Sequence, residues 1–141
     1  MKTLIALFVL GISSKVAAQD GYTIINEPGK HGVKILQGTI EKRLLQNDSS
    51  FKWYASSQRS YQPDSTLVNA FARMKDAGMH LVIFGGTWCE DTQQILPKLF
   101  KLQELSRLPD QQITLFGVNR NKVALGNITA ALCIYNVPTF M

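Results

Sequence analysis

Cys89 is the residue whose type and position most directly suggest chemistry. It lies in the segment Thr87 to Thr92 (Thr-Trp-Cys-Glu-Asp-Thr), between an apolar run and a long stretch with helical periodicity. A cysteine between a strand and the first turn of a helix has unpaired backbone N–H groups directed at its sulfur, and these favour the thiolate. Because the thiolate is the nucleophile, the position predicts thiol–disulfide exchange or oxidation at Cys89.

Four neighbours would shape the surroundings of that sulfur. Thr92 can direct its hydroxyl back and hydrogen-bond the thiolate, whereas Trp88 would cover one side of the site. Glu90 and Asp91 act in the opposite direction, because nearby carboxylates disfavour a further negative charge, although both suit a helix N-terminus. The sequence therefore predicts a thiol that is only modestly activated.

Cys133 is the other cysteine of the chain. Whether it meets Cys89 is open from the sequence, because a disulfide requires α-carbons within about 7 Å. Its neighbours Leu132 and Ile134 lie on a predicted helix, which favours a small buried apolar residue over a resolving thiol. Neither histidine is paired with a cysteine or acid at metal-ligand spacing, so we expect no metal site.

The elements that position Cys89 follow from apolar patterning. Residues 81–84 and 113–118 are expected strands, and a helix from near Cys89 that ends before Pro109 joins them. Such a crossover places its two strands in parallel, so the expected fold class is α/β. The helix is expected to turn these apolar residues inward: Ile95, Leu96, Leu99, Phe100, Leu102 and Leu105. Pro97 would bend it beside the site.

The flanking segments give weaker patterns. Residues 19–30 read as a linker, residues 33–40 as a short strand, and residues 51–60 as an aromatic helix capped by the segment 47–49. A helix opened by Pro63-Asp64 carries Leu67, Ala70, Phe71 and Met74 on one face until Gly78. A third helix is expected over residues 127–135.

The order of these features resembles the thioredoxin family. The Trp88-Cys89 pair follows an apolar strand, Pro97 comes eight residues later, and a second strand and a helix precede Val137-Pro138-Thr139. The match runs from about residue 81 to residue 141 and is most similar to exported bacterial members with a Gly-Gly-Thr-Trp-Cys-Glu-Asp-Thr segment. The resemblance implies a thioredoxin-like fold, with central parallel strands flanked by helices.

The same resemblance implies the roles of several residues. Cys89 and Thr92 would be catalytic, and Pro138 would be a cis-proline beside the sulfur. The backbone at Val137 and Thr139 would pair with an extended substrate peptide, and Trp88 would line the same substrate site. The implied partner is a protein or a low-molecular-weight thiol or disulfide, with no cofactor.

Two positions depart from the family pattern. The family has a second cysteine where this chain has Thr92, and a buried carboxylate where it has Ile83. Both changes remove the step in which the second thiol releases the substrate. Three interpretations stay open: a single-cysteine exchange protein resolved by an external thiol, a non-catalytic module that binds extended peptides, or a protein in which Cys89 is only structural.

The first eighteen residues have the pattern of a signal peptide. Lys2 precedes an apolar run of about ten residues, and small residues at 16–18 suit cleavage after Ala18. The run is too short to span a bilayer, so we expect export to the periplasm or the exterior without a stable membrane anchor. The expected organisation is a signal peptide (1–18), an N-terminal extension (19–62) and a thioredoxin-like domain (63–141) that lacks its C-terminal hairpin and helix.

Composition fits one globular domain and argues against nucleic-acid binding. The chain has 141 residues, of which 45 % are hydrophobic and 18 % are charged. Loss of Lys2 and Lys15 with the signal peptide would leave a weakly basic protein. Its basic residues are scattered rather than clustered on one element, so no nucleic-acid partner is expected.

Overall fold

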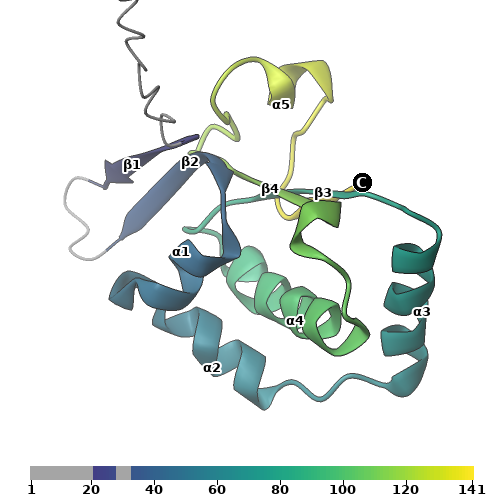
Figure 1. Ribbon diagram of the computed structural model, residues 1–141. Helices are drawn as coiled ribbons and strands as arrows, with labels where there is room; N and C mark the ends of the chain where they lie inside the picture. The colour runs from purple at the N-terminus through teal and green to yellow at the C-terminus, as the bar shows by residue number, and fades with distance from the viewer. Residues whose placement is uncertain (1–20, 28–32) are drawn as a thin grey trace, which may run out of the picture.

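The computed structural model describes residues 21–27 and 33–141, so the predicted signal peptide at 1–18 lies outside the described residues. The chain forms a five-stranded mixed sheet in the order β1-β2-β4-β3-β5, with helices packed against it (Figure 1). The strands are β1 (Tyr22–Asn26), β2 (Lys34–Ile40), β3 (Leu81–Gly85), β4 (Ile113–Gly117) and β5 (Thr139–Phe140). The helices are α1 (Lys42–Asn47), α2 (Lys52–Ser60), α3 (Ser65–Asp76), α4 (Glu90–Ser106) and α5 (Ile128–Ala131). Short 3-10 helices, η1 and η2, cover Ser49–Phe51 and Asp110–Gln112.

The central pair of strands confirms the predicted crossover. β3 and β4 are parallel, with partners from Leu81↔Ile113 to Gly85↔Gly117, and α4 connects them. The outer pairs are antiparallel, since β2 runs against β4 and β5 runs against β3. The α/β class is therefore correct, and parallel pairing is limited to the two central strands.

The central strands are buried on both faces, but by different segments. Ile83 belongs to a cluster under α2 and α4 that also contains Tyr54, Leu96 and Phe100. Its neighbour Phe84 points to the other face, where it stacks on Phe116 with ring centroids 5.1 Å apart. Figure 1 shows α5 and its loops on that second face, across the strands from α1, α2 and α4. Successive residues of β3 thus contribute to separate cores, as expected for a strand buried on both faces.

α4 begins and ends close to the predicted positions. Cys89 is its N-cap residue, and Arg107 closes it in the left-handed conformation, with a φ of 56°, before Pro109. The predicted inward face is wrong at two positions, since Ile95 and Leu105 are 43 % and 50 % exposed. Leu105 lies nine residues, or two and a half turns, after the buried Leu96 and therefore faces the opposite way.

Three other segments differ from the sequence prediction. Within the predicted linker, residues 22–26 form β1, which pairs with β2 in an antiparallel hairpin. The sequence does not predict α1. This helix has a single buried residue, Leu45, so it shows no repeating apolar pattern. The third helix is shorter than expected and ends at Ala131; Cys133 is exposed, with a φ of 52°, instead of buried on a helix.

The remaining predictions of elements are confirmed within a few residues. They are the bounds of β2, α2 and α3, and Asp64 caps α3 by accepting a hydrogen bond from Thr66 N. The predicted apolar face of α3 is wrong at Leu67, which is 46 % exposed, and α3 has no fully buried residue. Among the described helices, none combines the length and apolar character that crossing a bilayer requires.

Candidate functional site

Cys89 lies where the end of β3, the start of α4 and the segment before β5 converge. Its side chain is half-buried, and its Sγ donates a hydrogen bond to the backbone oxygen of Val137 at 3.4 Å. The next peptide bond, between Val137 and Pro138, is cis, as the resemblance implied. The fold therefore brings together the thiol of the α4 N-cap residue and the residue before the cis-proline, which lie 48 positions apart; the thiol itself makes no capping hydrogen bond. Thr139 begins β5 opposite Phe84.

Thr92 is buried and hydrogen-bonds to the loop that carries the sulfur. It is 1 % exposed, and its Oγ1 accepts a hydrogen bond from the Gly86 backbone N–H at 3.3 Å. Its methyl group fills the space over Gly85, where an added Cβ would lie 2.9 Å from Thr92 Cγ2. The sequence prediction assigned this hydroxyl to the thiolate, whereas the structure gives it to a backbone amide of the loop that carries Cys89.

Trp88 covers the side of the loop that faces β4. Its Nε1–H donates to the oxygen of Val118, which follows β4, at 3.0 Å. Val137 precedes β5, and β4 and β5 flank β3 on opposite sides. The indole and the sulfur of these adjacent residues therefore point to opposite sides of β3, and the sulfur faces the cis-proline.

Two side chains that sequence reasoning missed fix the loop from Gly86 to Cys89. Thr87 is buried; its Oγ1 donates to Lys34 O at 2.8 Å and accepts from Leu36 N at 3.3 Å. Gln93 Nε2 donates to Thr87 O at 2.8 Å from the first turns of α4. The loop is thus tied to both β2 and α4, and its conformation depends on residues from the segment that the sequence suggested to be an extension.

Glu27 and Arg120 form a second missed group beside Trp88. Arg120 Nη2 donates to Glu27 Oε2 at 2.7 Å, and Arg120 Nε donates to Glu27 Oε1. The Arg120 guanidinium carbon lies 5.0 Å from the centroid of the Trp88 ring. These residues are 93 positions apart, so no local pattern in the sequence could have paired them.

Glu90, Asp91 and Cys133 are exposed, in contrast to the half-buried Cys89. Glu90 and Asp91 are exposed in the first turn of α4, where carboxylates suit the helix N-terminus. Both cysteines are free thiols, and Cys133 lies in the exposed turn after α5. Among residues 21–27 and 33–141, no three metal-ligating side chains come together.

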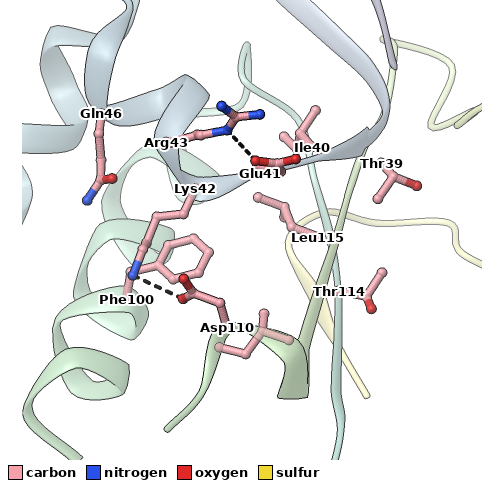
Figure 2. Close-up of a pocket in the computed structure, with 11 residues that line it drawn as sticks. Thr39, Ile40, Glu41, Lys42, Arg43, Gln46, Phe100, Asp110, Thr114 and Leu115 are labelled. Carbon is pink, nitrogen blue, oxygen red and sulfur yellow. Dashed lines mark hydrogen bonds and ion pairs between the residues drawn. The ribbon is translucent and has the colours of Figure 1, made fainter. Parts of the chain in front are cut away.

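A cavity of about 320 Å³ lies away from the sulfur, between α1, α4 and the start of β4. Figure 2 shows Ile40 and Leu115 among its apolar lining and Lys42 reaching toward Asp110. Lys42 Nζ lies 3.3 Å from the Asp110 carboxylate and donates to Gln103 Oε1 at 3.1 Å. The hydrogen bond from Gln103, helped by Lys42, lowers the pKa of Asp110 below its ordinary value. The lining of this cavity includes none of the residues around Cys89, so the cavity is separate from the candidate site.

Comparison with known proteins gives no relative. No family model, no curated protein and no solved structure matches this chain significantly. What the chain does must therefore be inferred from its own residues.

Proposed function

We propose that this chain is a thioredoxin-like protein that carries out thiol–disulfide exchange through the single cysteine Cys89. One observation carries the proposal: a half-buried thiol at the N-cap of α4 contacts the carbonyl of Val137, immediately before the cis Val137–Pro138 bond. At the N-cap position the sulfur lies next to the first turn of α4, and its partial exposure leaves it within reach of a substrate. This is the arrangement that the resemblance to the thioredoxin family implies.

The proposed reaction uses an external thiol for release. The Cys89 thiolate attacks one sulfur of a substrate disulfide, so a new S–S bond forms at Cys89 while the substrate S–S bond breaks. The departing sulfur keeps the electron pair of that bond and takes a proton from solvent. A second thiolate, supplied by a low-molecular-weight or protein thiol, then attacks the mixed disulfide and regenerates Cys89. Thr92 cannot perform this last step, since it has no sulfur.

Substrate binding is proposed along the segment from Val137 to Thr139. This segment precedes and begins β5, which pairs with β3, and it lies next to the Cys89 sulfur. An extended peptide disulfide would pair with the backbone of this segment while its sulfur meets Cys89. We also propose that the protein is exported, because an oxidising compartment would supply disulfide substrates.

A second function is favoured by Thr92 and Ile83. The hydroxyl of Thr92 is engaged by the Gly86 amide, and Ile83 is fully buried in the apolar core. Neither residue has a thiol, and Ile83 has no group that could transfer a proton. The alternative is therefore a non-catalytic module that binds extended peptides at β5 and the cis-proline segment.

A mixed-disulfide assay distinguishes the two functions. The reduced Cys133→Ser protein is incubated with glutathione disulfide at pH 7, and its intact mass is measured. If the protein carries out exchange, its mass should increase by one glutathione. The control protein with both Cys89→Ser and Cys133→Ser should show no increase in mass. No adduct in the presence of Cys89 would refute the exchange function and leave the binding module.

A gain-of-function variant probes the remainder of the site. Thr92→Cys places a thiol three residues after Cys89, where it could resolve the mixed disulfide without an external thiol. If the site is arranged as proposed, this variant reduces insulin disulfides with dithiothreitol as the electron source, faster than the parent. A folded Thr92→Cys protein without that gain would count against a thioredoxin-like site.

A further inference from the structure

The ion pair between Glu27 and Arg120 has no part in the exchange step, yet it lies against the Trp88 side of the site. Glu27 follows β1, and Arg120 lies in the loop after β4. Two parallel hydrogen bonds join the carboxylate to the guanidinium. A planar guanidinium held at two points has a fixed orientation, so Glu27 determines where the face of Arg120 lies.

Three contacts hold the Trp88 indole in place. On one side it lies against Gly86, where an added Cβ would come within 2.7 Å of the indole Cε2 and Nε1. Toward Arg120, the guanidinium carbon lies 5.0 Å from the ring centroid, within the range of a cation–π contact. The hydrogen bond from Nε1 to Val118 O fixes the rotation of the ring. Arg120 is the one of these three partners that acts through a side chain.

The direction in which the indole is held matters for the adjacent sulfur. Trp88 points toward β4, whereas Cys89 Sγ points toward Val137 on the β5 side. A large ring on the residue next to the sulfur would restrict access to it if the ring could move freely. A small reagent would pass such a ring more easily than a peptide or protein disulfide.

We propose that Glu27 and Arg120 are positioning residues that hold Trp88 on the β4 side of β3 and so keep the Cys89 sulfur open to bulky disulfide substrates. The inference rests on the proposed function for its substrate. It assigns to the β1–β2 hairpin a role in the site, because the hairpin supplies the carboxylate that orients Arg120.

The test measures the mobility of Trp88 and the access to Cys89 separately. All variants carry Trp53→Phe and Cys133→Ser, so that Trp88 is the remaining tryptophan and Cys89 the remaining cysteine. The first measurement is acrylamide quenching of Trp88 fluorescence. The second is the ratio of the Cys89 alkylation rates with a polyethylene glycol maleimide and with iodoacetamide. The variants are Arg120→Ala, Arg120→Lys and Glu27→Gln, and thermal midpoints show which are folded.

The expected changes in Trp88 quenching and in the Cys89 alkylation ratio correspond to the loss of one cation–π contact. Arg120→Ala should raise quenching and lower the alkylation ratio, each by about two- to fivefold. Glu27→Gln should also raise quenching and lower the alkylation ratio. Arg120→Lys, which keeps a cation, should give values between those of the parent and of Arg120→Ala. The matched control is Arg59→Ala on the exposed part of α2, which should behave like the parent.

Two results would overturn the positioning role. The first is quenching in folded Arg120→Ala and Glu27→Gln that equals the parent value. The second is raised quenching with an unchanged alkylation ratio, which would mean that a mobile Trp88 does not restrict the sulfur. If the parent forms no adduct with glutathione disulfide, the exchange function fails, while quenching and alkylation still decide whether these residues position Trp88.

Discussion

At the scale of single residues, the neighbours of Cys89 serve the loop more than the sulfur. Thr92 accepts from the Gly86 amide, Thr87 bonds to β2, and Gln93 holds the oxygen of Thr87. The cysteine type, its place before a helix and the following Pro138 were readable from the sequence. The direction of each hydroxyl was not, because a buried threonine bonds to whichever backbone group the tertiary structure brings near.

Thr92→Val tests the structural role of that hydroxyl. Valine keeps the shape of Thr92 but leaves the buried Gly86 N–H without its acceptor, which should lower the free energy of unfolding by about 1 to 3 kcal/mol. Thr92→Ser keeps the acceptor and is the control. Urea denaturation followed by far-UV circular dichroism measures both, and a Val variant as stable as wild type would show that the Gly86 bond contributes nothing.

At the scale of elements, the predictable parts were those with long, regular apolar patterns. α4 and the strands β3 and β4 could be predicted because each buries a repeating set of side chains. β1 could not, since Tyr22–Asn26 is largely exposed and forms a strand only by pairing with β2. The third helix is shorter than predicted although both apolar neighbours of Cys133 suit a helix, since Leu132 is 40 % exposed and only Ile134 is buried.

The junction between β2 and the helices after it should respond to acid. Asp48 precedes η1, accepts from Ser50 N at 2.9 Å and pairs with Lys34 of β2. The hydrogen bond from Lys34 is the main cause that lowers the pKa of Asp48 to about 2. Since the folded pKa lies below the unfolded value, the stabilisation is present above about pH 4 and is lost as the pH falls toward 2.

The measurement compares thermal midpoints of wild type and Asp48→Asn between pH 6 and pH 2. Asparagine can still accept from Ser50 but has no charge for Lys34. We expect wild type to be more stable by up to about 1 kcal/mol at pH 6, since the pair is partly exposed, and the difference to shrink steeply between pH 4 and pH 2. A difference that is independent of pH would rule out this ion pair as its source.

At the scale of the whole molecule, the N-terminal segments and the Cys89 region share one sheet and one core. β2 pairs with β4, and the Tyr54 ring of α2 lies 6.2 Å from Phe100 of α4, measured between centroids. Contacts between such distant residues have no local sequence pattern. For that reason the sequence suggested an extension up to residue 62 and gave no hint that β1 and β2 help to build the site.

Tyr54→Phe tests that shared core. Tyr54 is 1 % exposed, burial raises the pKa of its hydroxyl, and that hydroxyl makes no hydrogen bond within the described part of the chain. Removing an unpaired buried hydroxyl should raise the free energy of unfolding by about 1 kcal/mol in a single urea transition. Tyr61→Phe, at a less buried tyrosine, is the control. A loss of stability in Tyr54→Phe would reveal a partner for the hydroxyl.

Thiol exchange at Cys89 can be tested by competition between the two cysteines of one molecule. The reduced protein is treated with limiting iodoacetamide at pH 7, and peptide mass mapping gives the alkylation rate of Cys89 and of Cys133. Exposure alone favours Cys133, whereas the proposed exchange function requires Cys89 to be the more reactive thiol. We predict that Cys89 is modified faster despite being the less exposed thiol. Faster modification of Cys133 would contradict it.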